Sequence, residues 1–526
     1  MKEDSPGTKL NIAANLLLKS ICVLFLVLTE YITCAQVWPQ FQQNAERHGR
    51  VENNIEPPFR VRWIWTGKDH QLRNQNSHTD WSDDLDSRPG YNFPIRNSVD
   101  HTLAGTIQPV IGNNGRLYFA TMEGWAYCLD ADSGVTLWSY DLEAPCLSTA
   151  AIGDSIVVFA NVYGSVKAIH LNSGQLLWQR PTGFAITSHV LIHHGYVVIA
   201  NQFGTVFCLN QAGNEIWSRQ LSAGITGNLA AFENLIYVGS DDLVFYSLSL
   251  NDGEVMASTR LTGQHFRFTH PVVHGSKVWV TSASFPILGS EYVMESLMDG
   301  ASNFEQEETF IRRWLGGDDN GGSWPDASKD WEHVFALDKD NLNKDFIIPA
   351  GPVDGVGFPA PSVVVDNNDR VLTWWKTRFP TLTAASAFGT KYSLDIAAID
   401  IVTGGRKRID PGKLSGMWPL ETDNLYAMSV AGDQVWLRQA FRGTQMIDME
   451  EGSTRLVVAP IRYNDGGNFS SADVNYIDQR PELPQGSYGP YLMPNRPTEG
   501  RTPPAFAQGK VYIAEHFGIV CLETAK

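Results

Sequence analysis

Residues 127–140, "YCLDADSGVTLWSY", carry side chains that could bind a metal ion. Asp130 and Asp132 stand two residues apart, and carboxylate oxygens at such short spacing are ligands that calcium prefers. Ser133 and Gly134 follow, and the same order of residues suits a tight turn, because Asp accepts backbone N–H bonds and Gly takes left-handed conformations. The stretch is therefore either a calcium loop or a turn.

The motif recurs, and its repetition favours the turn. Later copies read "KAIHLNSGQLLWQR", "FCLNQAGNEIWSR" and "YSLSLNDGEVMAST". Their turn glycines lie 40, 39 and 40 residues apart, at Gly134, Gly174, Gly213 and Gly253. The place of Asp130 is taken in turn by His170, Asn210 and Ser249, whereas a calcium site would keep its acidic ligands. A period of this length indicates a repeat architecture.

Each repeat holds four short apolar runs separated by turn residues, the pattern of one four-stranded antiparallel sheet. Radial packing of such sheets leaves few exposed edges, so we predict an all-β, eight-bladed β-propeller. The last blade, at 503–523, has only three strands before the chain ends. We expect "FRVRWIWTG" at 59–67 to supply the fourth, so that an N-terminal strand pairs with the C-terminal blade.

Two residue columns are predicted to hold the blades together. Large indoles can lie flat between neighbouring sheets and donate their N–H to a backbone acceptor, and the column holds Trp138, Trp178 and Trp217. The fourth repeat has Met256 and Ala257 there, so its junction should be less well braced. A second column requires small, mostly apolar side chains, and we interpret its cysteines as core residues: Cys128, Cys208 and Cys521.

Residues 1–35 resemble a signal peptide, with lysines before a short apolar run and small residues before Gln36. The alternative is a lipoprotein anchored at Cys34. Residues 36–526 then form a single propeller domain. Three irregular insertions are expected in it, at 68–104, 286–331 and 463–502.

Composition excludes several functions. The net charge of −17 and the lack of a basic run argue against nucleic-acid binding. The six cysteines show no zinc, haem-attachment or disulfide-framework spacing. Acidic clusters at 80–86 and 316–322 do not follow the EF-hand pattern, and solvated loops explain them better than calcium sites. We expect no bound metal and a monomer.

The repeat Leu129-Asp130-Ala131-Asp132-Ser133-Gly134, followed by Trp138, resembles the tryptophan-docking repeat of pyrroloquinoline-quinone-like propellers. "WPQFQQNAERHG" at 38–49 is similar to the opening of exported members. The resemblance implies the fold strongly and the activity weakly, because the family contains both enzymes and non-catalytic scaffolds. Quinoprotein dehydrogenases of this superfamily hold their cofactor over the central channel, with a disulfide between adjacent cysteines and bound calcium. This chain has no adjacent cysteines.

Polar and cationic residues enter the predicted innermost strands, where side chains can face the mouth of the channel. They are Thr149, His189, Asn228, Arg267, His270 and Arg501. Such a ring could bind a small anionic or polar ligand, or it could cap the channel and bind water. No catalytic pair emerges from the spacing.

The function that these observations favour is that of an exported, non-catalytic binding or scaffold protein, periplasmic or secreted, with no cofactor. It resembles the propeller component of the outer-membrane barrel-assembly machinery more than a dehydrogenase. The alternative is an alcohol or sugar dehydrogenase that uses pyrroloquinoline quinone (PQQ) and calcium.

Overall fold

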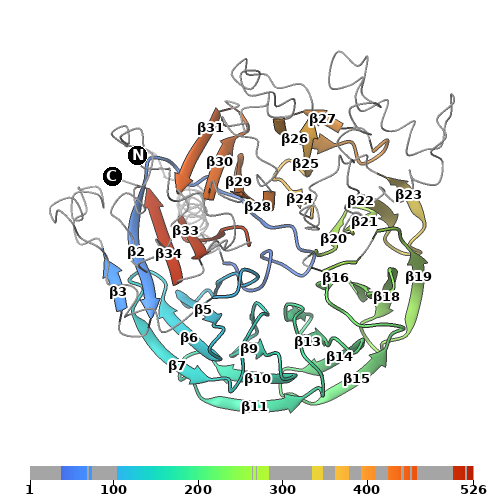
Figure 1. Ribbon diagram of the computed structural model, residues 1–526, viewed down its shortest axis with the longest axis horizontal. Coiled ribbons are helices and arrows are strands. Elements are labelled where there is room, and N and C mark those ends of the chain that lie inside the picture. The colour runs from blue at the N-terminus through green and yellow to red at the C-terminus, as the bar shows by residue number, and fades with distance from the viewer. Residues whose placement is uncertain are drawn as a thin grey trace, which may run out of the picture.

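The chain forms a ring of eight β-sheets, of which six have four sequential strands and two have five strands (Figure 1). This architecture comes from a computed structural model that describes residues 37–67, 70–73, 103–263, 265–267, 269–282, 334–347, 362–377, 393–404, 406–408, 425–439, 443–450, 453–458, 502–515 and 518–524. The described residues contain no helix, and so none that could cross a membrane. The predicted all-β propeller of eight antiparallel blades is confirmed.

The first four blades follow the sequence repeat closely. Blade 1 contains β4 (Val110–Ile111), β5 (Arg116–Ala120), β6 (Trp125–Asp130) and β7 (Thr136–Asp141). Blade 2 contains β8 (Ala151–Ile152), β9 (Ile156–Ala160), β10 (Ser165–His170) and β11 (Leu176–Pro181). Blade 3 contains β12 (Leu191–His193), β13 (Tyr196–Ala200), β14 (Thr205–Asn210) and β15 (Glu215–Gln220). Blade 4 contains β16 (Ala230–Phe232), β17 (Leu235–Gly239), β18 (Val244–Ser249) and β19 (Val255–Arg260).

The later blades keep the same strand order. Blade 5 contains β20 (Val272–His274), β21 (Lys277–Thr281), β22 (Val334–Asp338) and β23 (Lys344–Ile347). Blade 6 contains β24 (Val364–Val365), β25 (Val371–Thr377), β26 (Ser393–Ile399) and β27 (Arg406–Arg408). Blade 7 contains β28 (Leu425–Ala431), β29 (Gln434–Gln439), β30 (Gly443–Asp448) and β31 (Ser453–Val458), with β1 (Arg50–Val51) added parallel to β28. Blade 8 contains β32 (Ala505–Ala507), β33 (Lys510–Glu515) and β34 (Gly518–Thr524), followed by β2 (Phe59–Gly67) and β3 (His70–Arg73).

The repeated Asp-x-x-Gly motif forms the turn between the third and fourth strands. The Oδ1 atom of Asp130 accepts the backbone N–H of Ser133 at 2.7 Å, and the N–H of Gly134 bonds the Asp130 carbonyl at 2.7 Å. In blade 2 the Nδ1 atom of His170 accepts the N–H of Ser173 in the same way. A carboxylate and an imidazole both accept this backbone N–H, which explains why both residue types occur at this position of the repeat.

Each regular tryptophan docks on the turn of the next blade, as predicted. The indole N–H of Trp138 donates to the carbonyl of Leu171 at 3.0 Å, and a Cβ on Gly174 would lie 2.8 Å from the Trp138 ring. The turn glycine is therefore required for its lack of a side chain as well as for its positive φ of 70°. Two more junctions repeat this arrangement: Trp178 on Gln211 and Gly213, and Trp217 on Leu250 and Gly253.

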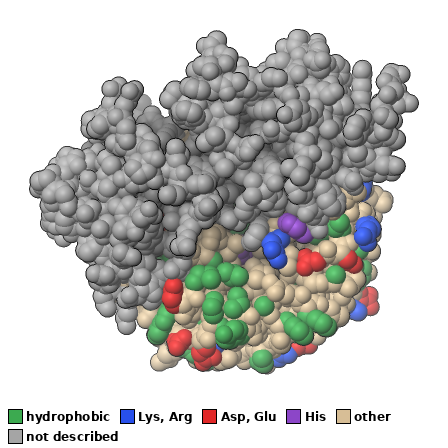
Figure 2. Space-filling model, in the orientation of Figure 1, with side chains coloured by type: hydrophobic (Ala, Val, Ile, Leu, Met, Phe, Trp, Pro, Cys, Tyr) green, Lys and Arg blue, Asp and Glu red, His purple; other side chains and the backbone are tan. Residues whose placement is uncertain are grey.

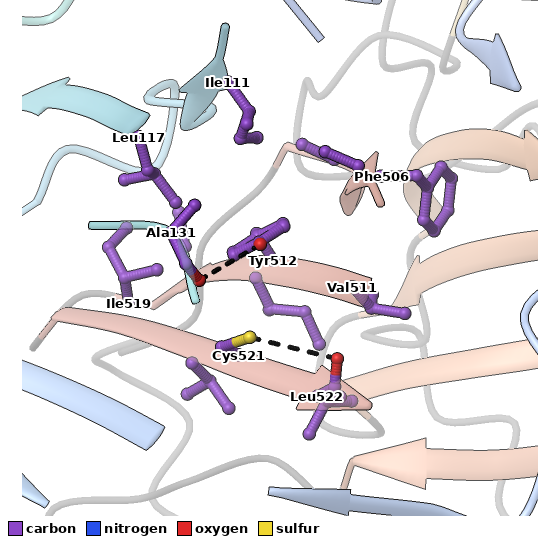
Figure 3. Packing of buried hydrophobic residues seen from close by; sticks show 14 of the residues in the cluster. Ile111, Leu117, Ala131, Phe506, Val511, Tyr512, Ile519, Cys521 and Leu522 are labelled. Atoms are coloured by element: carbon purple, nitrogen blue, oxygen red, sulfur yellow. Dashed lines mark hydrogen bonds between the residues drawn. The ribbon is translucent and has the colours of Figure 1, made fainter. Parts of the chain in front are cut away.

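The ring closes between blade 8 and blade 1 as the sequence predicts. Strand β2 pairs antiparallel with β34, with Phe59 opposite Thr524 and Trp63 opposite Cys521. Tyr512 on β33 points across the junction, and its hydroxyl donates to the carbonyl of Ala131 in blade 1 at 3.1 Å (Figure 3). The buried column cysteines are free thiols in the core, as expected: Cys128, Cys208 and Cys521.

The junction after blade 4 is packed differently. Ala257 stands at the tryptophan position, and the facing turn of blade 5 has Leu342 where the other turns have glycine. Leu342 keeps the left-handed conformation with φ of 59° and is fully buried, in one hydrophobic cluster with Phe245 and Ala257. A leucine thus fills space that an indole fills elsewhere. Whether this junction is weaker remains a prediction.

Several predicted segments lie outside the described residues. They include the signal peptide, the alternative anchor at Cys34, and most of the three insertions. Within the stretch predicted to be irregular from residue 68, residues 70–73 form β3, which pairs with β2 as a fifth strand of blade 8.

Candidate functional site

Residues 38–51, here called the channel segment, lie inside the ring of blades (Figure 1). Seven innermost strands each donate one backbone N–H to this segment, over distances of 2.8 to 3.2 Å. The donors are Ile111, Ile152, Ile192, Ala231, Val273, Val365 and Val430. The acceptors, in the same order, are the carbonyls of Trp38 and Pro39, the side chain of Gln40, and the carbonyls of Ala45, Glu46, His48 and Gly49.

The channel segment therefore visits blades 1 to 7 in sequence order. Blade 8 is reached through Trp38, whose ring meets that of Phe506 edge-on at 5.5 Å. An innermost strand has a free edge of backbone donors and acceptors towards the channel, and such groups are costly when they are buried without partners. The segment pairs many of these groups, so it acts as a core element of the ring.

Four of the predicted mouth residues form a belt of hydrogen bonds between neighbouring blades. The backbone N–H of Gln108 donates to Thr149 Oγ1 at 3.0 Å, and the backbone N–H of Thr149 donates to His189 Nδ1 at 3.0 Å. The amide of His189 then donates to Asn228 Oδ1 at 2.9 Å, and that of His270 to Ser362 Oγ at 2.9 Å. The structure therefore brings Thr149, His189, Asn228 and His270 into one buried belt, in which three of their side chains accept backbone N–H bonds.

Phe41 of the channel segment lies between two of these residues. Its ring centroid is 4.0 Å from that of His189 and 5.1 Å from that of His270. Arg47 stands beside it, with its guanidinium carbon 5.8 Å from the Phe41 centroid. Burial, and after it the charge of Arg47, lowers the pKa of His270 to about 3. Burial, then Arg47 and His270, likewise hold the pKa of His189 well below its usual value.

The remaining mouth residues are placed apart from this belt. Arg267 is exposed at the surface of the connection between blades 4 and 5. Arg501 lies outside the described residues. Binding of a small ligand by the predicted set stays a prediction, and Phe41 and Arg47 are the residues that sequence reasoning missed. The only available signal was that "WPQFQQNAERHG" has no counterpart among the repeats.

Exposed aromatic side chains gather on the face of the propeller at which the innermost strands begin. Phe184 follows β11, Phe203 joins β13 to β14, and their rings stack with centroids 4.3 Å apart and planes 10° apart. Tyr163 precedes Gly164, which packs on the backbone of Phe184. These side chains keep 48%, 53% and 76% of their surface exposed for Phe184, Phe203 and Tyr163. We call them the aromatic patch; Figure 2 shows that hydrophobic side chains also gather in groups on the face seen there.

The repeat itself does not require this patch. Blade 1 has Glu123 at the position of Tyr163 and Phe203, and blade 4 has Asp242 there. The connection after blade 1 has Ala144 at the position of Phe184. Large exposed apolar groups that the fold does not need mark interaction surfaces.

The described channel residues do not fit a quinone with calcium. Thr149, His189 and Asn228 are committed to the belt, and the Phe41 ring covers His189. Across the described ranges, no group of three His, Cys, Asp or Glu residues is arranged to hold a metal ion. No reaction step is therefore assigned to these residues.

Eight blades, three of which dock a tryptophan on the turn glycine of the next blade, form a propeller whose repeats resemble those of pyrroloquinoline-quinone-like propellers. Residues 74–163 and 162–294 match the family model described as outer membrane protein assembly factor BamB. These residues make up less than half of the chain, and blades 6 to 8 continue the same architecture beyond them. No curated protein sequence matches the chain.

Two solved structures are similar to this fold at low sequence identity. BamB from Moraxella catarrhalis is 14% identical, with a TM-score of 0.41 over 64% of this chain and 80% of that one. The computationally designed protein Ika8 is 13% identical, with a TM-score of 0.48 over 81% of this chain and 96% of that one. These comparisons concern architecture and say nothing of activity.

Proposed function

We propose that this protein is an exported, non-catalytic binding or scaffold propeller of the cell envelope or exterior. The observation that carries the proposal is the channel segment, which bonds seven blades from inside the ring. The resemblance places the cofactor of quinoprotein enzymes over this channel, where Phe41, His189 and His270 now pack together. A partner would then bind to the outer faces and loops of the propeller and not inside the channel.

The aromatic patch is the surface that fits this role. Phe184 and Phe203 stack on each other in solvent, and Tyr163 is the most exposed of the three. Aromatic side chains supply large contact areas at low entropic cost and are enriched at protein interfaces. A protein partner also agrees with the description of the matched family as an assembly factor.

Enzyme and scaffold are separated by adding PQQ and calcium to the purified protein. We expect no bound-quinone absorbance, no shift in the unfolding temperature and no dye reduction with alcohols or sugars. A stoichiometric quinone complex that reduces the dye would overturn the proposal and establish the dehydrogenase.

Partner binding is tested by in-cell photocrosslinking from the aromatic patch. A photoreactive residue at position 163 should yield a discrete crosslinked protein, and the double substitution Phe184→Ser with Phe203→Ser should abolish it. The matched control is Leu177→Ser with Met256→Ser, which removes exposed apolar side chains from the outer strands at 50% and 57% exposure. Loss of the product in the control as well would show that the patch is not the docking surface.

A further inference from the structure

Arg47 is a buried cation with one hydrogen-bond donor that has no partner among the described residues. Its side chain is fully buried; its Nε donates to the carbonyl of Leu229 at 2.8 Å and its Nη1 to that of Phe41 at 2.6 Å. Its Nη2 has no hydrogen-bond partner in the part of the chain that the structure describes, and no carboxylate there forms an ion pair with it. A buried charge without a counter-charge is costly, and an orphaned donor of this kind calls for a ligand.

The two neighbouring histidines also offer donors. His189 Nδ1 accepts the amide of Thr149, so in the neutral ring the proton is on Nε2. His270 Nε2 lies 3.5 Å from the amide nitrogen of Gln42, which also donates to the carbonyl of Met428 at 3.2 Å. Since that nitrogen can only donate, the His270 proton is assigned to Nδ1.

These three side chains surround one residue, and each offers a hydrogen-bond donor. Arg47, His189 and His270 all lie around Phe41, and each has at least one N–H without an acceptor among the described residues. His189 and His270 are buried and retain 3% and 6% of their surface. The nearest acidic side chain along the segment, Glu46, is partly exposed and makes no ion pair with Arg47 within the described ranges.

We propose that the mouth of the channel binds a small monovalent anion, of the size of chloride or a single carboxylate group. The ion accepts hydrogen bonds from His189 Nε2 and His270 Nδ1 and neutralises the guanidinium of Arg47. The inference is independent of the scaffold function, because it concerns the inner site and not the aromatic patch. Of the six residues predicted to bind a ligand at the mouth of the channel, the proposal keeps His189 and His270, and it adds Arg47.

The belt itself offers a matched variant. Asn228 takes the same place in the next blade, where its Oδ1 accepts the amide of His189. His189→Asn therefore keeps an acceptor for Thr149 and removes the Nε2 donor, together with the ring that packs on Phe41. His194→Asn is the control, because His194 is an exposed residue at the far end of β12, with a φ of 48° that asparagine tolerates.

The measurement is the unfolding temperature of the full chain against chloride or acetate, at an ionic strength kept constant with a bulky sulfonate. We expect a saturable rise for the unchanged protein and for His194→Asn, with about tenfold weaker binding in His189→Asn, as the loss of one charge-assisted hydrogen bond implies. Crystals of the unchanged protein soaked in bromide should show an anomalous peak beside His189 Nε2. An equal salt response in all three proteins, or no bromide at the mouth, would overturn the proposal.

Discussion

The indole N–H of Trp63 donates to the carbonyl of Ala131 at 3.2 Å, across the junction where the chain closes its ring. The geometry repeats that of Trp138 on Leu171, and both tryptophans lie opposite a column cysteine, Cys521 and Cys128. Strand β2 therefore supplies more than backbone pairing for blade 8. It carries the docking tryptophan of that blade, so the closure is a fourth copy of the tryptophan junction.

Replacement of Trp63 should consequently weaken the junction between blade 8 and blade 1. We expect Trp63→Ala to lower the free energy of unfolding by about 3–5 kcal/mol, the usual cost of removing a large buried aromatic side chain. Trp63→Phe should cost less, because it keeps most of the packing. Urea unfolding followed by tryptophan fluorescence measures both, and a smaller loss for Trp63→Ala than for Trp63→Phe would contradict the assignment.

The ring of blades could be predicted from the sequence because the spacing of the repeated residues fixes the positions of strands, turns and junctions. The spacing of Trp138, Trp178 and Trp217 predicted the junctions, and the incomplete eighth blade predicted the pairing of 59–67. The channel segment left no such signal. Many of its bonds to the blades join backbone groups, which every residue has, and the segment occurs once, so no internal comparison exposes it.

The mouth of the channel was predicted in part for the same reason. The column position of His189 and Asn228 follows from the repeat, but their bonding to neighbouring blades depends on the distance between strands. Arg47 is distant in sequence from both, and only the path of the segment brings it to the histidines. The spacing of repeated residues cannot predict where a segment that occurs only once lies in the ring.

The junction after blade 4 offers a designed exchange. Ala257→Trp alone should overpack against Leu342 and lower the free energy of unfolding by about 1–3 kcal/mol. Leu342→Gly alone should cost about 2–4 kcal/mol, because the lost packing outweighs the relief of a strained positive φ. The double variant restores the tryptophan–glycine pair of the other junctions, so its loss should be smaller than the sum of the two.

The measurement for this exchange is a double-mutant cycle from chemical unfolding. A favourable coupling of at least about 1 kcal/mol is expected for residues in contact. Additive losses would mean that residues 257 and 342 do not face each other. Ala168→Trp combined with Leu342→Gly serves as the distant pair, since Ala168 lies in β10 of blade 2, and its coupling should be near zero.

The channel segment should protect the amides that it bonds. In the double variant Trp38→Ala with Phe41→Ala the segment loses its two buried aromatic anchors. Hydrogen exchange at the amides of Ala231, Val273 and Val365 should then accelerate at least about tenfold, because their acceptors are in the segment. The amide of Val157, inside blade 2, is the control, and equal acceleration there would indicate loosening of the whole ring.

Stability should fall as the pH drops below 7, because buried histidines must take up protons when the chain unfolds. Burial lowers the folded-state pKa of His48 to about 4 and that of His270 to about 3, and the pKa of His189 lies well below 6.5. The unfolded chain therefore binds more protons between these values and 6.5. Each such group should remove about 2 kcal/mol between pH 7 and pH 5. Urea unfolding of His189→Asn at both pH values should show a decline smaller by that amount, and an unchanged decline would show that His189 is not neutral and buried.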